Sequence, residues 1–488
     1  MTRLPLAPPS ALGLAVLLVA APLGAQRTRP APPAEPPPAA LVPRTTFDGP
    51  TFDFDFPAVH VGVAEYDAGP TGATVFHFPN GVAAAVDVRG GAPGTTATDF
   101  LRLGYSTTFV DAIAFAGGSS YGLAAAAGVA AELRDRSGSS GAWGSIATVP
   151  GAIIFDLGNR RFTTVTPDEA LGRAALRAAV PGRFPLGPRG AGRFAMQGGF
   201  FDTPRPGSPG GFYDRRQHSG QGAAFRQVGP TKIAVFTVVN ALGVVVDRDG
   251  RVVRCSSDPA VRECGTVADL LARTLAERAS AAPAPAAPPA DSSDAEGPSR
   301  HTTLTLVVVN RKLDFWALQR LAVQVHSSMA RAIQPFHTQQ DGDVLFAVTT
   351  AEVDDAALPP PMLGVVAGEV AWDAVLRSVP PLPPRDTVAV RADAAVLDAV
   401  AGRYVLGPDA ALVVTRDGGR LFVEAAGPRP VYGFVPGERA EVRPTADGHF
   451  VSRNVRRDRL RFDRDARGRV TGLELNPGPW GLPARRLP

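Results

Sequence analysis

The sequence predicts an α+β fold followed by a small all-β domain. Apolar β-rich runs alternate with helical periods through residue 378, and a Pro-rich break (PPLPPR, 380–385) ends that pattern. After the break, short alternating strands are separated by turns such as Arg416-Asp417-Gly418-Gly419, a pattern typical of a sandwich or barrel. The chain has 488 residues, 45% hydrophobic and 20% charged, so it can bury a sizeable core.

The helices and strands of the main region can be placed from the spacing of their apolar residues. Residues 122–135, 165–180 and 314–333 have helical spacing, the second opening at Thr166-Pro167-Asp168-Glu169. Strands are expected at 61–63, 74–78, 82–88, 232–239, 302–310 and 344–348. Pro79-Asn80-Gly81 predicts a hairpin turn between two of them. The strand 232–239 ends at Asn240.

The N-terminus predicts export. Arg3 precedes an apolar run at 12–21 that is too short to span a bilayer, and Leu23-Gly24-Ala25 offers a cleavage site. We therefore expect a signal peptide at 1–25 and a secreted or periplasmic protein without stable membrane insertion; a buried N-terminal helix is the alternative. Residues 26–45 are a Pro/Ala-rich stretch that predicts a disordered leader.

Charge and cysteine content narrow the function classes. The 50 basic and 46 acidic residues give a net charge of +4, with no basic stripe interleaved with aromatics, so nucleic acid is not an expected partner. The two cysteines, Cys255 and Cys264, could close a small loop in an oxidising compartment or stay free thiols. Their spacing does not resemble a zinc site.

A threonine at the end of a linker is the first feature that suggests chemistry. Residues 279–300 are rich in Ala, Pro and Ser and predict an exposed, flexible linker, which would leave the bond before Thr302 accessible. Cleavage between His301 and Thr302 would give Thr302 a free α-amine, which can act as base for its own hydroxyl. By position alone, Thr302-Thr303 could also be an ordinary pair of β-formers.

Two further patterns could assist such a nucleophile. Asp341-Gly342-Asp343, with His337 four residues upstream, places two carboxylates in one turn, where they could orient an ammonium group. A solvated turn is the plain alternative, and a calcium loop would lack its other ligands. Glycine-rich loops at 89–95 and 117–123 could present backbone N–H groups to an oxyanion, or be tight turns. Neither has the spacing of a phosphate-binding fingerprint.

Six segments in order resemble the P1-type peptidases. This group contains the DmpA-like L-aminopeptidase/D-esterases, the β-peptidyl aminopeptidases and the nylon-oligomer hydrolases, and is similar to N-terminal nucleophile hydrolases. The segments are VDVRGGAPGT (86–95), AGGSSYGL (116–123), AIIFDLG (152–158), VVNALGVVVD (238–247), HTTLTLVVVN (301–310) and HTQQDGDVLFAVTT (337–350). The resemblance implies a four-layer αββα sandwich over residues 46–378. It also implies that the chain cleaves itself between residues 301 and 302.

The resemblance also implies roles for individual residues. Thr302 would be the nucleophile, Asn240 the oxyanion-stabilising amide, Tyr121 a pocket residue, and Asp341 and Asp343 the acidic pair. It implies no metal or organic cofactor, a small peptide, amide or ester substrate, and a homo-oligomer of processed heterodimers. Further possible pocket residues are Ser119, Ser120, Thr303 and His218.

Two positions depart from the family pattern. His301 stands where the family usually has Asn or Gly, which bears on the rate of self-cleavage. His218 stands where a lysine often opens a glycine-rich segment, and the preceding stretch 200–216 (FFDTPRPGSPGGFYDRR) resembles an extra loop. After a linker at 379–392, residues 393–488 resemble the small β-barrel-like domain appended to secreted serine β-lactamase-like hydrolases, without a catalytic set.

The sequence therefore predicts a self-processing serine/threonine-type aminopeptidase or amidase that acts through an acyl-enzyme on Thr302. Two alternatives remain. One is a binding or scaffold homologue weakened by His301 and His218. The other is an acyltransferase of the ornithine acetyltransferase type, against which the signal peptide argues.

Overall fold

The structure is a computed structural model. It describes residues 41–102, 104–105, 109–138, 141–158, 160, 162–201, 216–256, 263–280, 301–382, 388–454 and 457–487. The predicted signal peptide, most of the leader and nearly all of the linker 279–300 lie outside these residues.

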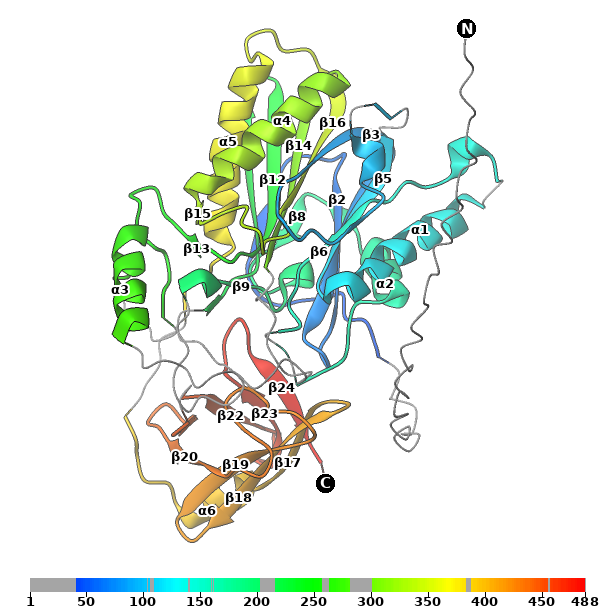
Figure 1. The fold of residues 1–488 in the computed structure, drawn as a ribbon. Coiled ribbons are helices and arrows are strands. Elements are labelled where there is room, and N and C mark those ends of the chain that lie inside the picture. The colour runs from blue at the N-terminus through cyan, green and yellow to red at the C-terminus, as the bar shows by residue number, and fades with distance from the viewer. Residues whose placement is uncertain are drawn as a thin grey trace, which may run out of the picture. The chain divides into compact units, whose positions relative to one another are not determined.

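A ten-stranded sheet forms the main domain (Figure 1). Its order is β11-β12-β14-β16-β3-β5-β6-β4, with β2 on β3 and β7 on β2. The pairs β14–β16 and β5–β6 are parallel, and the others are antiparallel. The strands are β2 (His60–Tyr66), β3 (Thr71–Val88), β4 (Thr95–Thr96), β5 (Phe109–Ala116), β6 (Gly151–Ile153), β7 (Val180–Pro181), β11 (Gln221–Val228), β12 (Thr231–Asn240), β14 (Thr302–Arg311) and β16 (Val344–Val353).

Strand β3 joins the two halves of this sheet. Its first part, through His77, pairs with β2, and its last part, from Ala83, pairs with β16. The predicted hairpin at Pro79-Asn80-Gly81 is wrong, because the chain continues through it as one strand. Pairing with β5 shifts register between His77 and Val82, and Gly81 has a φ of +63°. Asn-Gly supplies a left-handed residue, and a strand irregularity can use that conformation as well as a turn can.

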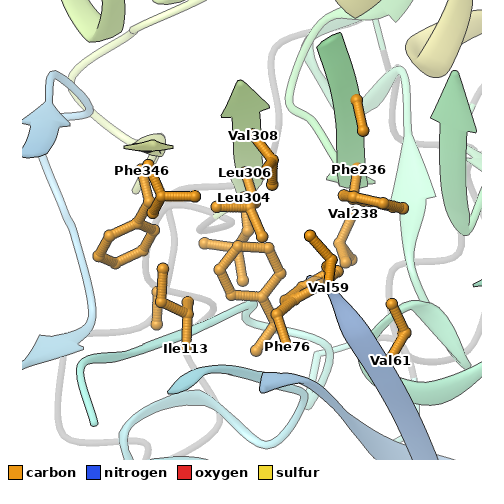
Figure 2. Close-up of a cluster of buried hydrophobic side chains, with 14 of the residues drawn as sticks. Val59, Val61, Phe76, Ile113, Phe236, Val238, Leu304, Leu306, Val308 and Phe346 are labelled. Carbon is orange, nitrogen blue, oxygen red and sulfur yellow. The ribbon is translucent and has the colours of Figure 1, made fainter. Parts of the chain in front are cut away.

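The side chains divide the main domain into four layers, as the resemblance implied. Alternate residues of one strand enter different cores: Leu304, Leu306 and Val308 face the other sheet half, where Phe76, Ile113 and Val61 meet them (Figure 2). Val307 and Val309 of the same strand pack beneath the helices α4 and α5. The opposite sheet half is covered by α1 and α2 (Figure 1). Burial on both faces explains why these strands are continuous apolar runs.

The helices are α1 (Ala124–Ser137), α2 (Glu169–Arg177), α3 (Val267–Ser280), α4 (Phe315–Ser328), α5 (Pro360–Arg377) and α6 (Ala394–Val400). Two predicted helices start later than their periods suggested, because carboxylates cap them. The side chain of Asp168 accepts from Leu171 N, and that of Asp314 accepts from Ala317 N. A 3-10 turn, Met329–Arg331, follows α4.

The C-terminal region is a closed antiparallel barrel of eight strands, which confirms the predicted all-β domain. Its strands are β17 (Gly402–Gly407), β18 (Ala410–Asp417), β19 (Arg420–Ala426), β20 (Ala440–Pro444), β21 (Phe450–Ser452), β22 (Arg459–Arg464), β23 (Val470–Leu475) and β24 (Leu482–Arg486). The barrel core includes Phe162 and Phe194 of the main domain, so it extends into that domain.

Short strands complete the structure: β1 (Thr51–Asp53), β8 (Arg183–Pro185), β9 (Met196–Gln197), β10 (Gln217–His218), β13 (Val244–Val245) and β15 (Ile333–Gln334). The candidate pair Cys255 and Cys264 is a disulfide, with Cα atoms 5.7 Å apart. None of the helices in the described part of the chain has the length and apolar character needed to cross a membrane.

Candidate active site

Thr302 is the first residue of β14 and is almost completely buried, with 2% of its surface exposed. Its hydroxyl donates a 2.6 Å hydrogen bond to the carbonyl oxygen of His301, the residue on the other side of the predicted cut. His301 is buried as well, so the expectation of an accessible bond is wrong. The adjoining chain covers it: His301 forms a parallel bridge with Asp341, and its N–H donates to Gln340 O.

A second donor reaches the same carbonyl. Gly342 N–H lies 2.7 Å from His301 O, so a hydroxyl and a backbone amide both hydrogen-bond to the carbonyl of the bond where the cut is predicted. Only glycine fits here, because a Cβ on Gly342 would lie 2.6 Å from Thr302 Oγ and 2.7 Å from Ala92 O. A backbone N–H aimed at a carbonyl oxygen stabilises the charge that develops when the carbonyl is attacked. The predicted acidic turn therefore also holds a backbone N–H against this carbonyl.

The carboxylates on either side of Gly342 are fully buried and hydrogen-bonded. Asp343 accepts from Thr303 N (2.7 Å), next to Thr302, and from both the N–H and Nδ1 of His337 (3.0 Å each). Asp341 accepts from the N–H and hydroxyl of Thr338 (3.0 and 2.6 Å) and from Leu242 N (3.2 Å). The solvated-turn alternative is therefore wrong for this pair. Burial, and then the charge of Asp343, raises the pKa of Asp341 to about 6.

The first glycine-rich loop holds this turn in place. Arg89 N and Gly90 N donate to Asp343 O, Gly91 N donates to Thr338 O, and Ala92 N donates to Asp341 O. A Cβ on Gly90 would lie 2.2 Å from Asp343 N. These N–H groups are used by the protein's own carbonyls, so the loop positions the acidic pair instead of binding an oxyanion directly.

Asn240 lies opposite Thr302 in the β12–β14 ladder and is fully buried. Its Oδ1 accepts from Met196 N (3.0 Å), which leaves Nδ2 as the donor, and Nδ2 donates to Phe155 O (3.1 Å). The His301 carbonyl thus receives Gly342 N–H, while the Asn240 amide donates to Phe155 O.

The second glycine-rich loop connects to Asn240 through residues 154–156. Gly118 N donates to the carboxylate of Asp156 (2.8 Å) and Ser119 N donates to Ile154 O (3.0 Å). Two side chains of this loop are exposed to solvent: that of Ser120, and that of Tyr121, with 72% of its surface exposed. Within the described residues, no hydrogen bond or ring contact joins Tyr121 to Thr302, Asn240 or the acidic pair.

A cation that sequence reasoning missed lies beside the cut. A Cβ on Gly199 would lie 2.8 Å from His301 Nε2 and 3.4 Å from Arg216 Nε, so both side chains pack on this glycine. Burial, helped by the positive charge of Arg216, lowers the pKa of His301 to about 3. His301 is therefore neutral near pH 7. His218, two residues after Arg216, instead stacks on Trp480 of the barrel.

His337, which sequence reasoning had placed near the acidic pair, lies against a second histidine, His326, that it had not singled out. The rings of His337 and His326 are 4.3 Å apart, and His326 Nδ1 lies 2.9 Å from Asp87 Oδ2. Burial lowers the pKa of His326. The signal available in the sequence was the HTQQDGD spacing, which places His337 beside Asp343. The described residues contain no group of three or more His, Cys, Asp or Glu side chains arranged to hold a metal.

This fold and this site are those of a hydrolase that acts on amide bonds, and the comparisons agree. The sequence matches the model of peptidase family S58 over residues 54–202 and 210–398, so the chain belongs to peptidase family S58. The resemblance predicted from the six segments is confirmed. The gap in the match falls in the stretch that resembled an extra loop.

The names of two relatives refer to different activities. A 6-aminohexanoate-oligomer endohydrolase of Kocuria sp. (strain KY2) is 41% identical over 348 residues, 69% of this chain and 88% of the relative. An uncharacterized aminopeptidase of Mycobacterium bovis is 36% identical over 327 residues, 63% of this chain and 84% of the relative. The solved L-aminopeptidase D-Ala-esterase/amidase of Ochrobactrum anthropi has a TM-score of 0.44 at 16% identity, covering 69% of this chain and 87% of that one.

Proposed function

We propose that the protein cuts itself between His301 and Thr302 and then hydrolyses amide bonds through an acyl-enzyme on Thr302. The observation that carries this proposal is the arrangement at the buried bond: Thr302 Oγ and Gly342 N–H both hydrogen-bond to His301 O. A bond buried to this extent is out of reach of another protease. The group poised to attack it is the protein's own hydroxyl.

Self-cleavage would proceed as an acyl shift followed by hydrolysis. Thr302 Oγ attacks the His301 carbonyl carbon and gives up its proton, and the buried carboxylates Asp341 and Asp343 are the nearby acceptors. The C–N bond breaks as the Thr302 nitrogen takes up a proton, which leaves an ester between His301 and Thr302 Oγ. Water then opens the ester, giving a carboxylate on His301 and restoring the Thr302 hydroxyl, beside the α-amine freed in the shift.

Turnover would use the new α-amine as the base. It removes the proton of Thr302 Oγ, which attacks the substrate carbonyl; the amine product leaves with a proton, and water releases the acid. Departure of His301 O frees Gly342 N–H for the substrate oxyanion, and the Asn240 amide lies beside it. Losing one such donor typically costs ~10²–10³ in rate. Asp341 and Asp343 would orient the amine or hold the substrate's ammonium group.

For the substrate, we infer an amide-linked oligomer of amino acids, from which the enzyme releases N-terminal residues. A second candidate is internal cleavage of 6-aminohexanoate oligomers, which the 41% identity to an endohydrolase of that name favours. Digests of α-peptides, amino-acid p-nitroanilides and 6-aminohexanoate oligomers separate the two, because internal cleavage yields shorter oligomers before monomers.

The deciding experiment compares the parent protein with Thr302→Ala and Thr302→Ser. The parent should give two chains on a denaturing gel and hydrolyse amides, and Thr302→Ser should retain both properties because it keeps a hydroxyl. Thr302→Ala should stay as one chain and be inactive. A processed or active Thr302→Ala protein would refute the assignment. An uncut parent that binds substrates without hydrolysis would favour the scaffold alternative, and acyl transfer to ornithine would favour the acyltransferase.

We also propose that the protein works outside the cytoplasm. The Cys255–Cys264 disulfide supports an oxidising compartment, since such bonds rarely persist in the cytosol. Cell fractionation of the native host, with mass spectrometry of the mature N-terminus, tests both the location and the predicted cut after Ala25. Recovery of the protein in the cytosol with Met1 still present would contradict this.

A further inference from the structure

A buried tryptophan is one of the barrel's contacts with the main domain. Trp480 lies between β23 and β24, with 6% of its surface exposed. Its indole N–H donates to Ser219 O (2.7 Å), and its ring stacks on the His218 imidazole, with centroids 5.4 Å apart and planes inclined by 21°. The guanidinium of Arg254 lies 5.3 Å from the Trp480 ring centroid and donates to His218 O (3.0 Å). Trp480 is thus held by a stacked ring, a hydrogen bond and a nearby cation.

A neighbouring contact strengthens the same junction. Gly481, the residue after Trp480, accepts a 2.9 Å hydrogen bond from Arg193 Nη2. Phe194 follows Arg193 and packs edge-on against His218, with centroids 5.3 Å apart. The barrel turn therefore contacts His218 of β10, Ser219 directly after it, and Arg193, three residues before β9 (Met196–Gln197), the strand that pairs with β10 (Gln217–His218) in a short ribbon.

This β9–β10 ribbon leads directly to the candidate active site. At its β9 end, Met196 N–H donates to Asn240 Oδ1 and so sets which way the Asn240 amide points. After its β10 end, Ser219 Oγ donates to Val239 O (2.5 Å) and Gly220 O accepts from Val239 N (2.9 Å). Val239 precedes Asn240 in β12, so the ribbon fixes both the backbone and the side chain at that position.

The ribbon also carries the residues that pack on the acyl side of the cut. Arg216 lies immediately before β10, Gly199 shortly after β9, and both lie against His301. A displacement of the ribbon would move these groups together with the Asn240 amide. Reaction rates are sensitive to such displacements, since a misplacement of about 1 Å can cost ~10²-fold.

The family match does not account for the barrel. It ends at residue 398, before the first barrel strand begins at Gly402. The barrel therefore adds to the shared hydrolase domain contacts to His218, Ser219 and Arg193, close in sequence to the residues that hold Asn240.

We propose that Trp480 is a positioning residue, through which the barrel holds the β9–β10 ribbon and, with it, the Asn240 amide in place for the reaction. This proposal rests on the proposed function, because it assigns Asn240 a part in amide hydrolysis. Trp480 itself does not touch the reacting atoms. Its effect is on the geometry of a donor that acts most strongly in the transition state.

The test uses the full-length protein with three substitutions. Trp480→Ala removes the stacking and the hydrogen bond, whereas Trp480→Phe keeps an aromatic ring on His218 and removes only the donor to Ser219. Phe462→Ala is the matched control, because Phe462 packs on Tyr404 and Phe450 within the barrel. For each protein, kcat and KM on an amide substrate are measured per processed chain, together with the melting temperature.

A positioning role predicts a particular kinetic signature. Trp480→Ala should lower kcat and kcat/KM equally, by roughly 10-fold to 100-fold, with KM unchanged within about twofold, as expected when a transition-state interaction is lost. Trp480→Phe should fall between the parent and Trp480→Ala, and it keeps the test informative if the alanine variant does not fold. Phe462→Ala should lower the melting temperature and leave kcat unchanged.

Two outcomes would overturn the proposal alone. In one, Trp480→Ala and Trp480→Phe keep the parent's kcat while melting at lower temperature, which would make the barrel a passive support. In the other, KM rises while kcat is unchanged, which would make the barrel part of the substrate entrance. A parent that neither cuts itself nor hydrolyses amides would instead overturn the proposed function, and this proposal with it.

Discussion

The pKa of Asp341 predicts the direction in which the rate of self-cleavage changes with pH. Its pKa, raised to about 6 by burial and by Asp343, means that the carboxyl is mostly protonated below pH 6 and ionised above it. If the ionised carboxylate accepts the Thr302 proton, the cleavage rate should fall by about tenfold for each pH unit below 6. The α-amine does not yet exist at this step, so its titration cannot obscure the result.

The measurement follows the single chain into two chains on denaturing gels, starting from refolded precursor at a series of pH values. Asp341→Asn is the control, since it keeps the shape of the side chain without a titrating group. We expect it to cleave slowly and to lose the dependence near pH 6. A variant that retained the same pH profile would assign the titration to another group.

We predict that His337 positions Asp343. Its backbone conformation tolerates both Asn and Gly, so these two substitutions form a matched pair. A carboxylate only accepts hydrogen bonds, so the Nδ1 that faces Asp343 Oδ2 at 3.0 Å carries the proton. His337 has a φ of +58°, a conformation that Asn and Gly both tolerate. His337→Asn can keep a donor at that place, and His337→Gly removes it without adding backbone strain.

We expect His337→Gly to slow self-cleavage and turnover by roughly 10-fold to 100-fold, the rate equivalent of ~1.5–3 kcal/mol for a hydrogen bond to a charged group. His337→Asn should stay close to the parent. Cleavage time courses and steady-state kinetics provide the comparison, with melting curves to check folding. Equal losses in both variants would show that the imidazole ring matters for packing and not as a donor.

At this scale, sequence reasoning found the side chains whose chemistry is visible in their type and spacing. Thr302 follows a linker, Asn240 ends a strand, and the two aspartates flank a glycine. The site residues it missed act through the fold. Gly342 contributes a backbone N–H, which has no sequence signature, and Arg216 reaches His301 only because β9 and β10 pair across the residues between them. The burial of the cut bond was missed for the same reason.

At the scale of elements, the turn that contains Gly342 and the loop at 89–92 act as one unit. A Cβ on Gly342 would lie 2.6 Å from Thr302 Oγ, closer than such atoms approach without displacement. Gly342→Ala should therefore reduce self-cleavage by at least ~100-fold, through displacement of the hydroxyl and of the Gly342 N–H. Gly419→Ala, whose Cβ would meet nothing within 4 Å, is the control and should cleave like the parent.

Gels of both proteins expressed side by side, with melting temperatures, give the result. Loss of cleavage together with a parent-like melting temperature is the expected outcome for Gly342→Ala. Cleavage at the parent's rate would mean that the turn yields and that the hydroxyl is not held where the structure places it.

Helices and strands were predictable where nearby residues in the sequence are sufficient to define them. The strands at 232–239 and 302–310 are long apolar runs, and the carboxylate caps at Asp168 and Asp314 set the true starts of two helices. The Pro79-Asn80-Gly81 turn was wrong because Asn-Gly reports a backbone conformation, not a chain reversal. Whether that conformation ends a strand or bends it depends on partners far away, in this case β2 and β16.

At the scale of the whole molecule, the layers were predicted only through the resemblance to a family. Alternate burial on two faces does not say which strands lie in which layer, because that depends on β3 spanning both sheet halves. The position of the barrel was not predictable, since the stack of Trp480 on His218 joins segments 262 positions apart in the sequence (480 − 218 = 262). Contacts of this kind depend on the assembled surfaces.

The layered core makes a final prediction about the cut protein. The predicted break would separate β12 from β14, yet these strands pair in continuous register from Ile233↔Val309 to Asn240↔Thr302. The later part of β3 likewise pairs with β16. Both central cores mix residues from before and after the break, as Phe76, Phe236, Leu306 and Phe346 do in one of them (Figure 2).

Because burial of apolar surface is the main driving force for folding, the two products should remain one folded unit after cleavage. With the signal peptide removed they would contain 276 residues (301 − 25 = 276) and 187 residues (488 − 301 = 187). Size-exclusion chromatography should elute both together, and they should separate only at denaturant concentrations that also abolish the circular-dichroism signal of the fold. Thr302→Ala, which stays uncut, is the reference. If the chains separated under native conditions, the β12–β14 ladder would depend on an intact chain, and the enzyme could not act in the cleaved form that the mechanism requires.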